Sequence, residues 1–306
     1  MNESLEIRMF MVGAVRKSLN VTSTFIFPAL SSRWCLLSIA SLIAVVGCAD
    51  FISSRENDIR DSTQAIEAAR NDSQRAKAYS SRGVAYSEKA RYGWITKQIP
   101  NAECERLFDL AIKDHNQAVA LNPNSAEVYF NRGQAYYDHG SQDFVYSAEP
   151  WIVTPSTKAW LDAAASDFEK AAEKDPKNDL VFDRLGLAYE EAGEEDKAVQ
   201  AYTQELALNP YGKKRLADAY CFFGFRHQQQ KEYGAAAAAY QKSTEFGIAD
   251  DKSCPYDPFE NSVAIYTRTT HEYDKAWEMV HRAQNVNRRI APELIERLKK
   301  VSGRTN

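Results

Sequence analysis

The histidines are the side chains of this sequence best suited to acid–base or metal chemistry, but their spacing supports neither. None of the five lies in a metal-binding pattern such as H-E-x-x-H: His115, His139, His227, His271 and His281. The sequence also contains no G-x-S-x-G motif, no P-loop and no pair of cysteines at zinc-ligand spacing. We therefore predict that the chain is not an enzyme and binds no metal or cofactor.

Cysteine chemistry is a second possibility, and Cys48 is its clearest case. Basic residues precede an apolar run from Trp34 to Val46, which has the length of a signal-peptide core and is short for a membrane span. The run leads into Val45-Val46-Gly47-Cys48. This resembles the lipobox of bacterial lipoproteins, in which a small residue precedes the cleaved bond and the cysteine receives the lipid. The resemblance implies a signal peptide over residues 1–47 and a lipidated Cys48 as the mature N-terminus.

The lipobox resemblance also implies a place in the cell. A lipid on Cys48 would hold the chain at a membrane of the bacterial envelope, facing the periplasm, with residues 48–58 as a polar tether. Ala49 favours the outer membrane, because an aspartate at this position of such lipoproteins favours retention in the inner membrane. Two alternatives stay open: an ordinary signal peptide or an uncleaved anchor, each with an incidental cysteine. A start codon at Met9 or Met11 would shorten the leading segment.

Cys104, Cys221 and Cys254 would remain after such processing. An oxidising periplasm allows one disulfide, and Cys221 with Cys254 is the best pair because they lie in one expected repeat and its exit loop. The other interpretation, which the sequence favours, is that all three are free thiols.

The elements that must position these residues are short amphipathic helices, seen most clearly over residues 178–210. Small or apolar residues follow the spacing i, i+3, i+4, i+7, which gathers them on one helical face: Phe182, Leu185, Gly186 and Tyr189. Gly193 then breaks this helix, and Pro210 ends a second one. The inward positions of the second helix are Ala198, Tyr202 and Glu205. We predict an antiparallel pair of helices that cross where Gly186 and Ala198 lack bulk.

The same pattern recurs around Gly83, Gly133 and Gly224, and in a weaker form around Ala264. It resembles the tetratricopeptide repeat (TPR), which has a period of about 34 residues and an aromatic-x2-Leu-Gly-x2-Tyr…Ala-x3-aromatic…Pro pattern. The resemblance implies an all-α fold, a right-handed α-solenoid of helix-turn-helix hairpins over residues 59–301 with capping helices. The expected repeats cover about 76–125, 126–178, 179–212, 217–250 and 257–290, followed by a C-terminal cap helix.

The first two expected repeats carry insertions between their helices, and the other three carry none. Both insertions are aromatic and contain proline, with Trp94 in the first and Trp151 in the second, and Trp160 adds further aromatic surface. Because stacked hairpins place equivalent turns on one edge, the two insertions should be neighbours. Their side chains either pack on each other as a small satellite core or form a ledge that contacts a partner.

A stack of hairpins presents a concave surface lined by its first helices, and such surfaces bind other proteins. The TPR resemblance places these groove residues there: Phe130, Gln134, Tyr137, Asp183, Leu187 and Phe225. Ser80 and Val84 stand where a TPR that grips a terminal carboxylate would have Lys and Asn. An apolar or helical segment of a partner therefore suits this groove better.

We predict a protein–protein interaction scaffold or adaptor of the bacterial envelope, bound to the membrane by its lipid. One alternative is a structural lipoprotein that associates with itself. Another is an accessory factor for an envelope enzyme or a secretion machine. We predict that nucleic acid is not a partner, because the formal net charge is -4 and the sequence has no basic stripe.

Overall fold

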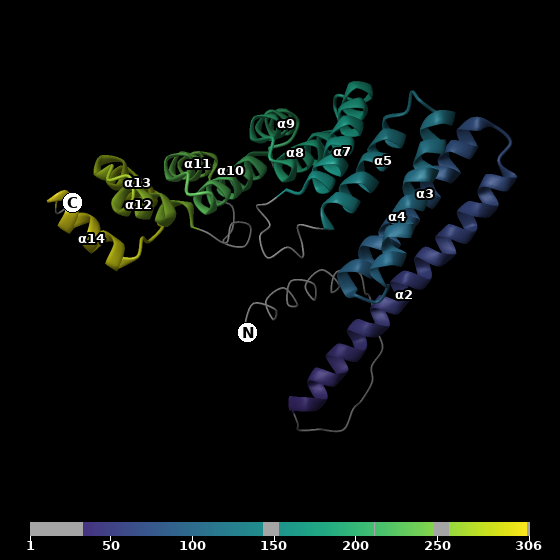
Figure 1. The fold of residues 1–306 in the computed structure, drawn as a ribbon, viewed down its shortest axis with the longest axis horizontal. Helices are drawn as coiled ribbons and strands as arrows, with labels where there is room; N and C mark the ends of the chain where they lie inside the picture. The colour runs from purple at the N-terminus through teal and green to yellow at the C-terminus, as the bar shows by residue number, and fades with distance from the viewer. Residues whose placement is uncertain (1–32, 143–152, 211, 248–256, 305–306) are drawn as a thin grey trace. The chain divides into compact units, whose positions relative to one another are not determined.

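The computed structural model describes residues 33–142, 153–210, 212–247 and 257–304, with side chains from Asp50 onward. All regular secondary structure in these ranges is helical (Figure 1). The helices are α2 (Arg33–Ala68), α3 (Asp72–Thr96), α4 (Asn101–Leu121), α5 (Ala126–Gly140), α7 (Pro155–Lys174), α8 (Asp179–Ala192), α9 (Glu195–Leu208), α10 (Gly212–Gln229), α11 (Tyr233–Phe246), α12 (Pro258–Arg268), α13 (Tyr273–Asn285) and α14 (Pro292–Ser302).

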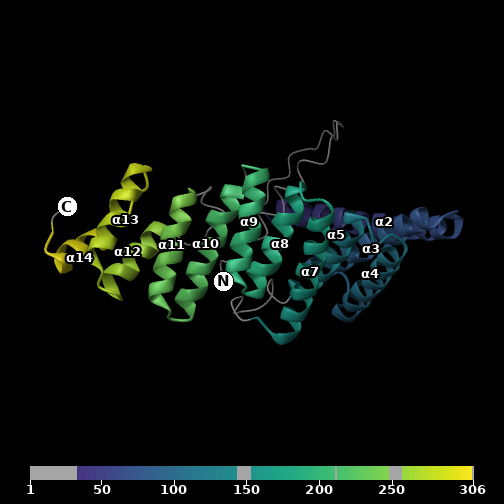
Figure 2. The same ribbon diagram turned by 90° about the horizontal axis from the view of Figure 1, so that it is seen from above.

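The chain divides into two compact units, Met1–Cys48 and Ala49–Asn306, and the hairpins lie in the second. Within that unit α3 packs on α4, α5 on α7, α8 on α9, α10 on α11, and α12 on α13. Each pair also contacts the next pair along the chain, so the hairpins follow one another in sequence order (Figure 2). The prediction of an all-α solenoid of helical hairpins is confirmed.

A glycine lies at the helix crossing in four of these hairpins, and it leaves room for an aromatic ring. A Cβ atom added at Gly186 would lie 2.4 Å from the ring of Tyr202 on the second helix, which is closer than any real contact. The matching pairs are Gly83 with His115, Gly133 with Phe168, and Gly224 with Tyr240. The aromatic ring of the second helix therefore packs directly on the backbone of the first, as the spacing of small and aromatic residues predicts.

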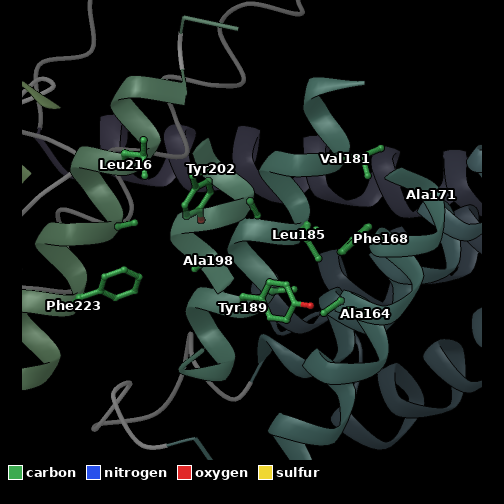
Figure 3. Packing of buried hydrophobic residues seen from close by; sticks show 14 of the residues in the cluster. Ala164, Phe168, Ala171, Val181, Leu185, Tyr189, Ala198, Tyr202, Leu216 and Phe223 are labelled. Carbon is green, nitrogen blue, oxygen red and sulfur yellow. The ribbon is translucent and has the colours of Figure 1, made fainter. Parts of the chain in front are cut away.

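Three apolar clusters lie in the described hairpins: a small one within the first hairpin and two larger ones that join the hairpins after it. The first larger cluster joins α7 to α11, and Figure 3 shows Leu185 and Tyr189 of α8 facing Phe168 and Ala164 of α7. The second larger cluster runs from α10 to α14, where Leu294 and Leu298 are buried. Helix α14 thus covers the C-terminal hairpin with one apolar face.

The first two hairpins cross through a buried ion pair, whereas the others cross through apolar side chains. Arg82 of α3 binds both oxygens of Asp114 on α4 at 2.6 and 2.9 Å, and Arg132 of α5 does the same to Asp167 on α7 at 2.6 and 2.8 Å. Each arginine also reaches the helix before its hairpin, at Thr63 (3.1 Å) or Asn116 (2.8 Å). The corresponding residues in the third hairpin are Leu185 and Ala201, both buried.

The first hairpin is longer than the others, because its extra residues extend its helices. Helices α3 and α4 have 25 and 21 residues, whereas α8 and α9 have 14 each. The sequence predicts an insertion at the turn of this hairpin. The turn itself is short, however, from Lys97 to Pro100. Gly93 stays helical and buried within α3, because the side chain of Ile99 fills the space beside it. The extra residues are therefore helical turns that build a small core of their own.

Helix α2 also differs from the expectation. Residues 48–58 were predicted as a polar tether, but they are helical within α2. Phe51, Arg55 and Glu56 contact α3, and those contacts explain why the segment is helical rather than extended. No helix in the described part of the chain is both long and apolar enough to cross a membrane.

Cys221 of α10 is disulfide-bonded, and Cys104 is a buried free thiol. The expectation that all three remaining cysteines are free is therefore wrong for Cys221. Its predicted partner, Cys254, lies outside the described residues. Within the described ranges no group of three or more His, Cys, Asp or Glu side chains is placed to hold a metal ion.

Candidate partner-binding site

A cavity of about 470 Å³ opens between the first helices of the first three hairpins, α3, α5 and α8. Its lining combines apolar side chains with amides and charged groups: Val84, Ser87, Glu88, Arg91, Trp94, Ile95, Asn131, Gln134, Tyr137, Asp138, Ser141, Gln142 and Arg184. Ligand sites typically combine apolar walls with fixed polar groups, and here Val84, Trp94, Ile95 and Tyr137 supply the apolar walls beside nine polar or charged side chains. We take this cavity as the candidate site.

Helical periodicity explains why these residues share one surface. On α3 the lining residues Val84, Ser87, Arg91 and Trp94 are spaced three or four apart, so they form one stripe. Gln134, Asp138 and Ser141 form the equivalent stripe on α5. The two stripes face each other because α3 packs on α5. The long α3 matters here, since Arg91 and Trp94 lie in its additional turns.

Asp138 is the most buried charged group of the site. Its carboxylate accepts a hydrogen bond from the Gln134 amide at 2.8 Å, and the guanidinium of Arg91 lies 3.7 Å away. Burial raises the pKa of Asp138 to about 6, although Arg91, Gln134 and Arg184 each act to lower it. Gln142 donates to the backbone oxygen of Asp138 and is 6% exposed. These bonds fix the floor of the cavity.

Tyr137 joins the site to the third hairpin. Its hydroxyl donates to a carboxyl oxygen of Glu191 on α8. Burial raises the pKa of Glu191 to about 8, while the hydrogen bond from Tyr137 acts to lower it. The carboxyl group is therefore mostly protonated and neutral at pH 7. This hydrogen bond fixes the Tyr137 side chain between α5 and α8.

The sequence around the site matches a known repeat family. Residues 108–140, which include most of α4 and all of α5, match the TPR repeat family. Residues 108–140 therefore resemble a TPR repeat. The small glutamine-rich tetratricopeptide repeat-containing protein 2 of Mycosarcoma maydis is 29% identical over 113 residues, which are 36% of this chain and 27% of that protein. The chain therefore covers about a quarter of the length of this curated relative.

Solved structures with similar helical arrangements include MamA and YrrB. MamA is 20% identical, with a TM-score of 0.36, and the match covers 65% of this chain and 90% of MamA. YrrB, described as a TPR protein with an unusual peptide-binding site, is 16% identical with a TM-score of 0.39. That match covers 80% of this chain and 93% of YrrB.

The TPR groove positions fall at several different places in the structure. Gln134 and Tyr137 line the cavity, together with Val84. Phe130 points toward the core instead, with its ring 5.7 Å from that of Phe168. Asp183 is buried and pairs with Arg215 at 2.5 Å, so it lines a separate cavity between α8, α9 and α10.

Leu187 on α8 and Phe225 on α10 are half-buried, and neither lines the cavity. The six expected groove residues therefore do not form one site.

The aromatic residues of the two insertions are also separated. Trp94 lines the cavity and packs beside the cluster of Ala90, Leu107 and Phe108. Trp160 lies on α7, where its ring packs on Tyr136 and His139 at centroid distances of 5.9 and 4.3 Å. Trp151 lies outside the described residues. Trp160 therefore packs within its own hairpin. Trp94 also packs on its own hairpin, but it lines the cavity as well.

Sequence reasoning missed the charged residues of the site, Arg91, Asp138, Arg184 and Glu191. A signal for Arg91 existed, since it continues the stripe of Val84 and Ser87 by one more turn. The sequence did not extend the stripe to Arg91, because it predicts an insertion between the two helices of this repeat. Glu191 carried no signal, because its role depends on the hydrogen bond with Tyr137, 54 residues away in sequence.

Proposed function

We propose that this chain is a protein-binding scaffold of the bacterial envelope, anchored by a lipid on Cys48, and that its partner docks in the cavity between α3, α5 and α8. The cavity carries this proposal. Apolar walls from Val84, Ile95 and Trp94 can bury an apolar side chain of a partner, while the amides of Asn131 and Gln134 can bind its backbone.

Site-specific photocrosslinking tests the docking site. A photoreactive amino acid at Gln134 points into the cavity, whereas one at Glu173, an exposed position on the second helix α7, does not. We expect a crosslinked partner in intact cells from position 134 and none from position 173. Adducts of the same mass from both positions would contradict a specific site.

A second variant separates binding from folding. Val84→Trp should fill the cavity from its half-buried rim and abolish the adduct at position 134, while the melting temperature stays near that of the wild type. Trp94→Ala is less selective, because Trp94 also packs on the small core of the first hairpin. We expect it to lower both stability and affinity, so affinity must be measured on the folded fraction.

The lipid anchor rests on the Val45-Val46-Gly47-Cys48 motif and has support from the disulfide of Cys221. Disulfides persist in oxidising compartments such as the periplasm and are rare in the cytosol. Ala49 favours the outer membrane as the destination. Cys48→Ala should abolish membrane retention and leave an unprocessed precursor. Incorporation of labelled fatty acid into that variant would contradict lipidation of Cys48.

Self-association remains the second candidate role, and light scattering on purified protein addresses it directly. If the protein stays monomeric over the micromolar concentration range, self-association is excluded and only the scaffold role remains. A stable oligomer whose formation is blocked by Val84→Trp would show that the cavity binds a second copy of the chain.

A further inference from the structure

The extended tip of the α3–α4 hairpin lies at the end of the folded unit where its N-terminus emerges. We propose that this tip, residues 94–100, rests on the surface of the phospholipid bilayer to which the chain is anchored. This inference rests on the proposed lipid anchor at Cys48, and it adds a contact surface and an orientation that the anchor alone does not require.

The first step is that α2 is fastened to α3 along most of its length within the second unit. The ring of Phe51 lies 4.3 Å from that of Tyr92, and Arg55 and Glu56 pair with Glu88 and Lys89 at 2.5 and 2.8 Å. Further along, Arg82 donates to Thr63 at 3.1 Å. Increasing numbers on α2 match decreasing numbers on α3, so the helices run antiparallel in a fixed register.

The second step is a distance along the chain. Cys48 precedes Phe51 by three residues, which span about 5 Å in a helix and at most about 11 Å when extended. Tyr92, beside Phe51, precedes Lys97 by five residues, or about 8 Å of helix. A lipid on Cys48 therefore cannot lie much further out than the turn of the hairpin. Without a flexible tether, the bilayer surface must come close to this turn.

The third step is the chemistry of the tip. Lys97, Gln98 and Pro100 are exposed, and the ammonium group of Lys97 lies 5.1 Å from the centre of the Trp94 ring. Trp94 is half-buried with its indole nitrogen inside the protein, so Lys97 is the group that faces outward, and lysine near the surface is attracted to anionic lipids. Two acidic groups on the neighbouring turns are paired with cations, Glu88 with Arg55 and Glu103 with Arg106. The tip thus offers a positive charge beside an aromatic ring.

The same hairpin provides an internal control for the experiment. Asn124, in the turn after α4, is exposed like Gln98. The 21 residues of α4 separate these two turns by about 30 Å. If the tip faces the bilayer, a probe at Gln98 lies at the lipid headgroups, and a probe at Asn124 lies in water.

The test uses the full chain, matured in bacteria and reconstituted in vesicles containing phosphatidylglycerol. An environment-sensitive fluorescent amino acid is placed at Gln98 or at Asn124, and lipids with a quencher at the headgroup are added. We expect quenching at Gln98 to exceed that at Asn124 severalfold. Lys97→Glu should reduce the quenching at Gln98 while the protein stays on the vesicles through its lipid.

Mass spectrometry of the mature N-terminus separates the two levels of the proposal. If the lipid is present on Cys48 but the two probes are quenched equally or not at all, the tip contact is overturned and the anchor stands. If Cys48 carries no lipid, the anchor fails and the tip contact fails with it.

Discussion

His115 shows how a single residue can keep the geometry of a repeat while changing its chemistry. It occupies the place that Phe168, Tyr202 and Tyr240 take in the next three hairpins, packed on the crossing glycine. Its side chain is fully buried, and neither ring nitrogen has a hydrogen-bond partner among the described residues. Burial lowers the pKa of His115 to about 3, and the charge of Arg132 acts in the same direction. The imidazole therefore packs as a neutral ring.

The low pKa of His115 predicts an acid-sensitive first hairpin. An unfolded histidine has a pKa of about 6.5, so below that pH the unfolded chain binds a proton that the folded chain cannot. Stability is lost as the pH falls from 6.5 toward 3, by about 2 kcal/mol at pH 5. His115→Phe should remove this loss, as measured by urea unfolding at pH 7 and pH 5.

The reciprocal substitution provides the matched control. Phe168→His places the same buried imidazole in the second hairpin and should add a second acid-sensitive loss of similar size. Equal pH dependence in the wild type and in His115→Phe would show that the imidazole is protonated in the folded protein.

At the scale of the helix pair, the glycine at the crossing sets the distance between helices. Gly186→Leu would drive a side chain into the ring of Tyr202, which has no room to move because it is buried and its hydroxyl donates to Glu190 at 2.8 Å. We expect a loss of about 1–3 kcal/mol or more in the free energy of unfolding. An unchanged melting temperature would mean that the third hairpin crosses elsewhere.

The ion pairs of the first two hairpins lead to a different prediction. Asp167→Ala leaves the half-buried guanidinium of Arg132 without its carboxylate, and we expect a loss somewhat below the roughly 3–5 kcal/mol that breaking a fully buried pair costs. The double variant Arg132→Leu with Asp167→Ala copies Leu185 and Ala201 of the third hairpin. It should recover most of the lost stability, as measured by chemical denaturation.

Failure of the double variant to recover stability would assign the loss to something other than the orphaned charge. The hydrogen bond from Arg132 to Asn116 on α4 is then the first contact to examine. The double variant removes this bond together with Arg132, whereas Asp167→Ala keeps the arginine that makes it.

The helix pairs also show what the sequence can and cannot predict. The spacing around Gly186 predicts the crossing, because small and aromatic residues at fixed positions leave one way to pack. The length of α3 was not predicted, because the extra residues of the first hairpin were assigned to an insertion at the turn. Gly93 is tolerated in the helix because Ile99 folds back onto it. The acidic residues around Tyr137 could not be placed, because their neighbours come from a different hairpin.

At the scale of the whole chain, Cys221 of the fourth hairpin is disulfide-bonded to another cysteine. If this cysteine is Cys254, the bond closes a loop of about 30 residues, which stabilises the folded state by roughly 3–4 kcal/mol in the chain-entropy estimate. A reducing agent should then lower the melting temperature of the wild type but not the melting temperature of Cys254→Ser.

Cys104→Ser is the control for the reduction experiment, because Cys104 is a free thiol and its loss should not alter the response to reductant. A response that persists in Cys254→Ser would assign the bond to a different cysteine.

The three-way contacts of Arg82 and Arg132 bear on how this chain can change in length during evolution. Each arginine needs a carboxylate in its own hairpin and a polar acceptor, Thr63 or Asn116, on the helix before it. Removing or duplicating one of the first two hairpins would break this match. The later hairpins meet through large apolar faces, together with single ion pairs such as Asp183 with Arg215 instead of the three-way contact of the first two hairpins. Homologous chains should therefore gain and lose repeats at the C-terminal end, while the N-terminal pair is inherited as one block.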